Sequence, residues 1–441
     1  MHVDDKTLYD LGVFSRYETQ SLLHYLDFTT TSGGKDWLRF FVKNPFSELG
    51  AIRDRQALLK HMADKQLPST ISNGLMMVMD KFYYSPITDI PSSASPIDVL
   101  VFKWLSRPEY VLLRYSVGHL ARFVYGMQKI YDLYGQDNPS EELTNLLDRV
   151  AHYLESDFFI QMAQMGSQVD KGGKLSAREI IKYGKQLYTI EAKAGIKFME
   201  EAFYKIDAWA SMAKAVSFHQ LAFPEIIDSQ LPVLEGQGLY HPLLEDPVAY
   251  DLSLGHEENF LFLTGANMAG KSTFIRSVGI GLYLASLGMG VAATSMKIST
   301  FDGILSNIEI TDNMTNGESY FYSEVQRVKT IVEKIQSKDK WLILIDELFK
   351  GTNIVDAMKC STAVVEGLRK VNSSLFILST HLYEIGEPLR KFDNIQFRYF
   401  ETKAEGDNLI FSYQLKEGIS NDRLGYLILQ REKVTDLLGQ L

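Results

Sequence analysis

Apolar and polar positions follow two different periods along this chain of 441 residues. Before about residue 226, apolar residues recur at three- and four-residue spacing, as in YETQSLLHYLDF (17–28) and DRQALLKHMADKQL (54–67). This spacing places apolar side chains on one face of an α-helix. The stretch 176–216 continues the pattern with few capping signals, which favours long helical arms over a compact bundle. Residues 1–226 are therefore predicted to form an all-α domain.

Short, nearly continuous apolar runs replace the helical spacing after FPEIIDSQLPVLEG (223–236). Three of them have the length and composition of buried parallel strands: NFLFLTG (259–265), WLILIDE (341–347) and SLFILSTH (374–381). Helical segments separate these runs, so a parallel sheet with crossover helices is expected. Residues 227–441 are predicted to form an α/β domain.

One uncharged stretch, SVGIGLYLASLGMGVAATSM (277–296), is nearly long enough to cross a bilayer. It follows a glycine-rich loop within one turn, and a membrane-spanning helix could not also present its N-terminus to a soluble ligand. We interpret it as a packed helix followed by a short strand. The N-terminus, MHVDDKTLYD, has no apolar signal core, and a single cysteine, Cys360, fits a reducing compartment. We expect a cytoplasmic protein without membrane contact.

The net charge of −10 provides no general positive field that would draw the chain to nucleic acid. Contact with nucleic acid would therefore need a local basic patch. Five cations are spaced by three or four residues and would form one stripe along a helix: Lys171, Lys174, Arg178, Lys182 and Lys185. A solvated charged face and a DNA-binding surface both fit this stripe.

The stretch FLTGANMAGKSTF (262–274) contains the pattern G-x-x-x-x-G-K-[ST] between a predicted strand and a predicted helix. In this setting the backbone N–H groups of the loop hold phosphates, and the helix dipole adds positive potential. Lys271 is expected to reach the β- and γ-phosphates, and the Ser272 hydroxyl to bind Mg²⁺. The stretch therefore predicts a nucleoside triphosphate, ATP, with Mg²⁺.

Two other predicted strands end in residues that suit hydrolysis. WLILIDE delivers Asp346 to the carboxyl end of its strand, where ligands of α/β sheets bind, and this carboxylate suits the Mg²⁺ shell. Glu347 suits the polarisation of an attacking water. His381 follows the third strand and is a candidate γ-phosphate sensor. The chain has no arginine-rich lid segment, so a hydrolase is favoured over a small-molecule kinase.

At these residues the chain resembles the MutS family of DNA mismatch-repair ATPases, a branch of the ABC ATPases. TGANMAGKST (264–273) is similar to that family's T-G-P-N-M-G-G-K-S-T, with Ala266 and Ala269 in place of the usual proline and glycine. DELFKGTNIVDA (346–357) and LSTHLYEI (378–385) are similar to D-E-x-x-[RK]-G-T-[ST]-x-x-D-[GA] and A-T-H-[FY]-x-E-[LI]. The resemblance implies that ATP is held by Gly265, Ala266, Asn267, Met268, Ala269, Gly270, Lys271, Ser272, Thr273 and His241.

The stretch DNMTNGESYFYSEV (312–325) lies where the family has its signature loop, which ends in G-x-S-T-F. Ser319 keeps the serine, while Tyr320 replaces threonine. The resemblance implies a homodimer in which Ser319 closes on the γ-phosphate bound by the other subunit. GLYHPLLE (238–245) and DPVAYDLSL (246–254) resemble the segment before the phosphate loop. The family has an adenine-stacking aromatic residue near Val248, and Tyr250 is the alternative here.

The resemblance covers nearly the whole chain, more closely in the second half. LLHYLDFTTTSGGKDWLRFFVKNPF (22–46) is similar to the start of the family's core-and-lever domain, and EGISNDRLGYLILQ (417–430) to its C-terminal helix-turn-helix. The implied fold is an all-α core/lever domain (1–226), then an ABC-type P-loop ATPase domain (227–441) ending in a helix-turn-helix at about 415–441. A short form without the mismatch-recognition and connector domains is expected.

Two functions of different classes remain open. The first is a MutS-type ATPase that hydrolyses ATP at a homodimer interface and switches a clamp on duplex or branched DNA, in mismatch repair, damage sensing or recombination. The second is an ATP-driven clamp on a protein or ribonucleoprotein, which the net charge of −10 and the missing mismatch wedge keep open. A chromosome-organising ABC ATPase would need much longer arms.

Overall fold

The computed structural model describes residues 1–15, 18–84, 87, 90–309, 320–405, 408–420 and 434–438. The chain divides into two compact units. Unit 1 comprises residues 1–25, 44–53 and 219–441, and unit 2 comprises residues 26–43 and 54–218. The sequence-based division is a single cut after residue 226, whereas the contacts group the N-terminal residues with the C-terminal half.

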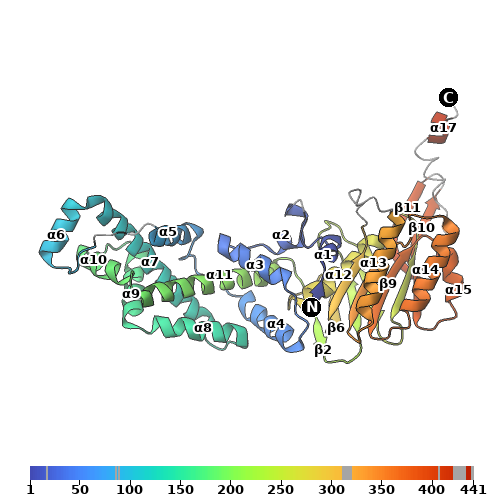
Figure 1. Ribbon diagram of the computed structural model, residues 1–441, viewed down its shortest axis with the longest axis horizontal. Helices are drawn as coiled ribbons and strands as arrows, with labels where there is room; N and C mark the ends of the chain where they lie inside the picture. The colour runs from blue at the N-terminus through green and yellow to red at the C-terminus, as the bar shows by residue number, and fades with distance from the viewer. Residues whose placement is uncertain are drawn as a thin grey trace. The chain divides into compact units, whose positions relative to one another are not determined.

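Unit 1 is built on a sheet of seven strands, counted over the described residues (Figure 1). The strand order is β1-β7-β8-β9-β5-β10-β11, and neighbours are parallel except for the antiparallel pair β10 and β11. The strands are β1 (His2–Val3), β5 (Phe260–Thr264), β7 (Gly303–Asn307), β8 (Trp341–Asp346), β9 (Ser374–Thr380), β10 (Ile395–Glu405) and β11 (Asn408–Glu417).

The three apolar runs of the sequence are the central strands β5, β8 and β9, which confirms the predicted parallel sheet. All their residues are buried because helices cover both faces. One face packs against α13 (Tyr320–Ile335), α14 (Ile354–Leu368) and α15 (Gly386–Leu389). The opposite face packs against α12 (Lys271–Ser286), beside which lies α1 (Asp5–Asp10).

A second, smaller sheet in unit 1 has the order β2-β6-β3-β4 among the described residues. Its strands are β2 (Glu225–Ile227), β6 (Ser295–Ser299), β3 (Leu234–Leu239) and β4 (Tyr250–Leu254). The uncharged stretch 277–296 runs through helix α12 and reaches strand β6, as predicted. None of the described helices combines the length and the apolar character needed to cross a membrane.

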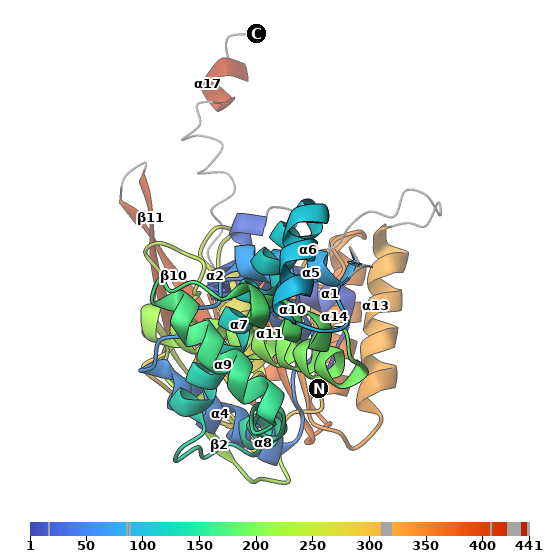
Figure 2. The ribbon, with the colours of Figure 1, turned by 90° about the vertical axis from the view of Figure 1, so that its left-hand side faces the viewer.

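The described residues of unit 2 form helices and no strand. Figure 2 views this unit from its α6 end. Helix α9 packs against the long helix α7, where Gly166 permits a close approach: a Cβ at this position would lie 2.0 Å from the Ala121 carbonyl oxygen. The helices are α3 (Ser32–Lys43), most of α4 (Leu49–Ala63), α5 (Asn73–Tyr84), α6 (Pro96–Leu105), α7 (Arg107–Tyr134), α8 (Glu141–Leu154), α9 (Asp157–Asp170), α10 (Ala177–Gln186) and α11 (Ile190–Phe218).

A buried carboxylate fixes the start of helix α3 to helix α11. Asp207 is 0% exposed, and it accepts hydrogen bonds from the backbone N–H groups and the hydroxyls of Thr30 and Thr31. The distances are 2.7 to 3.1 Å. These bonds satisfy donors at the N-terminal end of α3, a position where negative charge is also stabilised by the helix dipole.

Replacing Asp207 with alanine should lower the free energy of unfolding by about 3 kcal/mol, because it leaves buried donors without an acceptor. Urea denaturation of the full chain measures this change. The control is Glu201→Ala on the same helix, since Glu201 is 55% exposed and forms an ion pair with Lys205 at 3.3 Å. The control should change the free energy by less than about 0.5 kcal/mol. Equal effects of the two substitutions would contradict the role assigned to Asp207.

The N-terminal end of the chain differs from the sequence prediction, and the prediction for the C-terminal end stays untested. Strand β1 is a short parallel edge strand that the helical interpretation of residues 1–226 missed. The predicted helix-turn-helix at about 415–441 lies largely outside the described residues. Strand β11 ends at Glu417 and so occupies the first residues of the predicted motif. A short helix, α17, covers Val434–Leu438.

Candidate functional site

The phosphate loop connects strand β5 to helix α12 at the carboxyl edge of the large sheet. Gly265 and Gly270 have φ of 145° and 105°, which residues with a Cβ rarely adopt, and Met268 has φ of 69°. Helix α12 starts at Lys271, and the N-cap residue Gly270 has no side chain that could cap the helix. The first N–H groups of α12 are therefore available to an anion at the positive end of the helix.

The side chain of Lys271 folds back onto the loop. It is 5% exposed, and its Nζ donates hydrogen bonds to the carbonyl oxygens of Gly265 at 2.8 Å and Ala266 at 2.9 Å. Burial lowers the pKa of Lys271, an effect that the nearby carboxylates of Glu347 and Asp346 oppose. An anion beside this ammonium would compensate for its burial.

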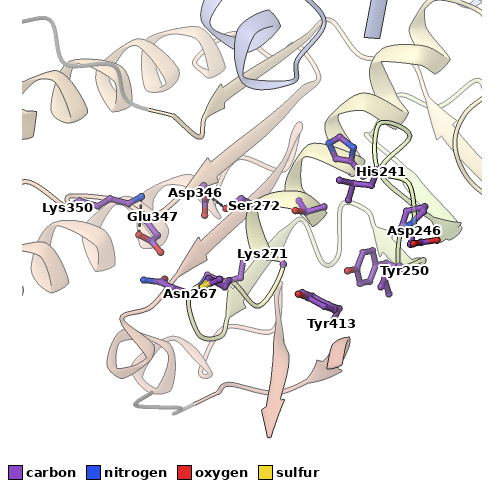
Figure 3. A pocket seen from close by; sticks show the side chains of 16 residues that line it. His241, Asp246, Tyr250, Asn267, Lys271, Ser272, Asp346, Glu347, Lys350 and Tyr413 are labelled. Carbon is purple, nitrogen blue, oxygen red and sulfur yellow. Dashed lines mark hydrogen bonds and ion pairs between the residues drawn. The ribbon is translucent and has the colours of Figure 1, made fainter. Parts of the chain in front are cut away.

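Asp346 and Ser272 meet as the sequence predicts. Asp346 ends strand β8, is 7% exposed, and accepts a hydrogen bond from the hydroxyl of Ser272 (Figure 3). It also accepts a hydrogen bond from the hydroxyl of Ser379. No cluster of three His, Cys, Asp or Glu side chains that could hold a metal occurs among the described residues. The pair of oxygen ligands fits Mg²⁺, which usually keeps several waters and takes one or two protein oxygens beside substrate phosphates.

Glu347 lies in a strained turn directly after β8. Its φ is 60°, and its N–H donates to the Ser379 carbonyl oxygen at 2.9 Å. Its carboxylate lies 3.0 Å from the Lys350 Nζ and 3.6 Å from the His381 Nδ1. Burial alone would raise the pKa of Glu347, but the neighbouring His381 and the charge of Lys350 bring it to about 2. The carboxylate is thus ionised at neutral pH and suited to orienting and polarising a water.

A pocket of about 650 Å³ opens beside these groups (Figure 3). Six residues of the predicted phosphate loop line it, together with Asp346 and Glu347, whereas Gly265, Ala266 and Ala269 do not. The six are Asn267, Met268, Gly270, Lys271, Ser272 and Thr273. His241 also lines the pocket, and burial together with the nearby Arg276 lowers its pKa to about 4, so its ring is neutral at pH 7.

The same pocket is also lined by Val248, Tyr250 and Tyr413. Tyr250 is 6% exposed, and its ring packs edge-on against Phe274 and Phe400, at 5.3 and 5.6 Å between ring centroids. Tyr413, on strand β11, is 41% exposed. An exposed ring can stack on a planar base, whereas the ring of Tyr250 is already covered by its aromatic neighbours. The sequence did not indicate Tyr413, because the pairing of β11 beside the loop is a tertiary feature.

The remaining predicted residues lie elsewhere. Ser319 is outside the described residues, as is the rest of the segment 310–319, which holds most of the predicted signature loop (312–325). The last residues of that stretch, 320–325, form the start of helix α13. His381 is 52% exposed beside Glu347 and is not part of the pocket lining.

The predicted single helical stripe of five cations is wrong. Helix α9 ends at Asp170, Gly172 adopts φ of 82°, and Ser176 with Glu179 forms a capping box that starts helix α10. Lys171 and Lys174 therefore precede α10, which holds only Arg178, Lys182 and Lys185. Gly172 and Gly173 favour a turn, and this local signal outweighs the spacing of the cations.

Fold and site together define the class: a parallel α/β domain with a phosphate-binding loop between β5 and α12, a P-loop nucleotide-binding domain. Residues 261–435 match the family model described as MutS domain V. This match over residues 261–435 bears out the resemblance to the MutS family drawn from the motifs.

Curated relatives agree with this assignment. DNA mismatch repair protein MutS of Thermotoga maritima is 29% identical over 242 residues, which cover 54% of this chain and 30% of that protein. The proteins of the same name from Fervidobacterium nodosum and Chlorobaculum tepidum are 30% identical over 50% and 53% of this chain, and 27% of each relative. The matched part thus spans less than a third of the length of these relatives.

Proposed function

We propose that the chain is an ATPase of the MutS type, which binds Mg-ATP in the pocket and hydrolyses it. The observation that supports this most strongly is the convergence of Lys271, Ser272, Asp346 and Glu347 at one pocket beside the N-terminus of helix α12. Each of these side chains has the chemistry that phosphoryl transfer to water requires.

Each group of residues in the pocket has a different proposed role in hydrolysis. The N–H groups at the start of α12 and the Lys271 ammonium would hold the phosphates, and Tyr413 would stack on adenine. Mg²⁺, held by Ser272 with Asp346, would neutralise phosphate charge. Glu347 would orient the attacking water, and His381 would sense the γ-phosphate. A pKa of about 2 makes Glu347 a weak base, so orientation and polarisation supply most of its effect.

We further propose that two copies pair through unit 1 and that Ser319 of one copy completes the site of the other. Exposed apolar side chains support a pairing surface there. Tyr322 and Val325 on α13 are 47% and 37% exposed, and Ile354 and Val355 at the start of α14 are 64% and 57% exposed. Such a twofold pairing is the usual form of a homodimer.

ATP would then switch a clamp on DNA, as the names of the relatives suggest for mismatch repair. Arg178, Lys182 and Lys185 on α10 remain the proposed DNA contacts of unit 2, with Lys171 and Lys174 in the preceding turn. The alternative is a clamp on a protein or ribonucleoprotein. The net charge of −10 and the interrupted stripe of cations favour that alternative.

The test is ATP hydrolysis by the purified full chain, with Mg²⁺ and with excess EDTA. We expect turnover between about 0.01 and 10 per second that depends on Mg²⁺. Gel-shift assays with homoduplex, mismatched duplex, four-way junction and RNA, each with and without ATP, separate the two clamps. Absence of hydrolysis would refute the ATPase, and absence of ATP-dependent binding to any DNA would favour the alternative.

A further inference from the structure

A buried carboxylate on helix α13 supports the loop that contains Glu347. Glu324 is 0% exposed. Its Oε1 accepts the backbone N–H of Lys350 at 3.1 Å, and its Oε2 accepts the backbone N–H of Gly351 at 3.3 Å. Burial raises the pKa of Glu324, while hydrogen bonds from the loop N–H groups oppose the rise. One side chain of α13 therefore caps consecutive N–H groups of a loop that follows strand β8.

This loop has a backbone that needs support. Glu347 and Phe349 both adopt φ of 60°, which is disfavoured for residues with a Cβ. Phe349 is 4% exposed and packs against Phe321 of α13, with 5.7 Å between ring centroids. Helix α13 thus holds the loop by an apolar contact and by the Glu324 carboxylate, and both contacts fix the backbone that follows Glu347.

Lys350 connects this support to the reacting group. Its backbone N–H is held by Glu324, and its Nζ lies 3.0 Å from the Glu347 Oε2. We propose that Glu324 is a positioning residue that orients the Glu347 carboxylate for hydrolysis through the loop and Lys350. The inference rests on the proposed ATPase function. Glu324 does not line the pocket, so it acts without touching the nucleotide.

The test compares Glu324→Ala and Glu324→Gln in the full chain. Misplacement of a catalytic group by about 1 Å can cost about 100-fold in rate. We therefore expect kcat for ATP to fall about 100-fold in Glu324→Ala and less in Glu324→Gln, whose amide oxygen can still accept one N–H. KM and the Kd for ATP should stay within about twofold, because a loss confined to kcat marks an interaction used only in the transition state.

The matched control is Glu333→Gln. Glu333 lies on the same helix, is 60% exposed and pairs with Lys329 at 3.7 Å. Its replacement should leave kcat unchanged. Thermal unfolding of all variants reports whether the fold is intact, and Glu324→Gln keeps the shape of the side chain should Glu324→Ala fail to fold.

A double-mutant cycle separates positioning through Lys350 from a general loss of stability. Lys350→Met should lower kcat as Glu324→Ala does, because the Lys350 Nζ lies 3.0 Å from the Glu347 Oε2. Adding Glu324→Ala to Lys350→Met should then lower kcat no further, since both substitutions act through one contact.

Hydrogen exchange of the Lys350 and Gly351 amides provides a readout independent of activity. Exchange should be faster in both Glu324 variants and unchanged in Glu333→Gln. Unchanged kcat in Glu324→Ala, or additive losses of kcat in the double variant, would overturn the inference alone. Failure of the wild type and of Glu333→Gln to hydrolyse ATP would instead refute the proposed function.

Discussion

Replacing Glu347 with glutamine should lower kcat for ATP hydrolysis about 10²- to 10⁴-fold, the usual contribution of a positioned acid–base group. The amide keeps the shape of the side chain, but it has no negative charge with which to polarise a water. The affinity for ATP should change little, because Lys271 and the start of α12 remain in place. Initial rates at saturating Mg-ATP measure the first quantity, and equilibrium binding of a fluorescent ATP analogue measures the second.

The control for this substitution is Glu384→Gln, because Glu384 is an exposed carboxylate three residues after His381. Its removal should leave kcat within about twofold of the wild type, as expected for a surface site away from the chemistry. If Glu347→Gln kept the wild-type rate, another group would have to polarise the water, and the role of Glu347 in the proposed mechanism would be wrong.

Replacing Lys271 with alanine should weaken ATP binding by about 100-fold or more. A hydrogen bond to a charged group contributes about 1.5 to 3 kcal/mol, and about 1.4 kcal/mol corresponds to a tenfold change in Kd. Loss of two phosphate contacts of the ammonium should therefore raise the Kd for ATP by more than tenfold for each contact. The protein without nucleotide should lose little stability. The folded state disfavours the charged form of Lys271, since burial lowers its pKa, and alanine removes this cost together with two hydrogen bonds to carbonyl oxygens.

Thermal unfolding with and without Mg-ATP measures both effects together. At a ligand concentration 100 times the Kd, binding should stabilise the wild type by about 2.7 kcal/mol. This stabilisation should be absent in Lys271→Ala and retained in Lys338→Ala, which removes an exposed lysine of unit 1. An ATP-dependent rise of the midpoint in Lys271→Ala equal to that of the wild type would contradict the assignment of the phosphate loop.

The central strands and the phosphate loop were predictable because their signals are local. A continuous apolar run can only be a buried strand or helix, and the runs at β5, β8 and β9 are too short for buried helices. The loop glycines have positive φ, which a sequence pattern can encode directly. Strand β1 was missed because two residues show no period.

The site contacts that the sequence missed depend on the fold. Glu324 is 23 residues before Glu347 by 347 − 324, and only the packing of α13 brings it to the loop. Tyr413 meets the pocket through the pairing of β11 with β10. The interrupted basic stripe is a different case. Gly172, Gly173 and the capping-box residues Ser176 and Glu179 are local sequence signals for a helix break, and they outweigh the regular spacing of the cations.

The most direct test of the account is sedimentation velocity of Glu347→Gln with saturating Mg-ATP. Because this variant should bind ATP without hydrolysing it, the account predicts that it sediments as a dimer with Mg-ATP and as a monomer without nucleotide. The double variant Lys271→Ala, Glu347→Gln should sediment as a monomer with or without Mg-ATP. A Glu347→Gln protein that binds Mg-ATP fully and still sediments as a monomer would contradict the proposal that ATP joins two copies of this chain.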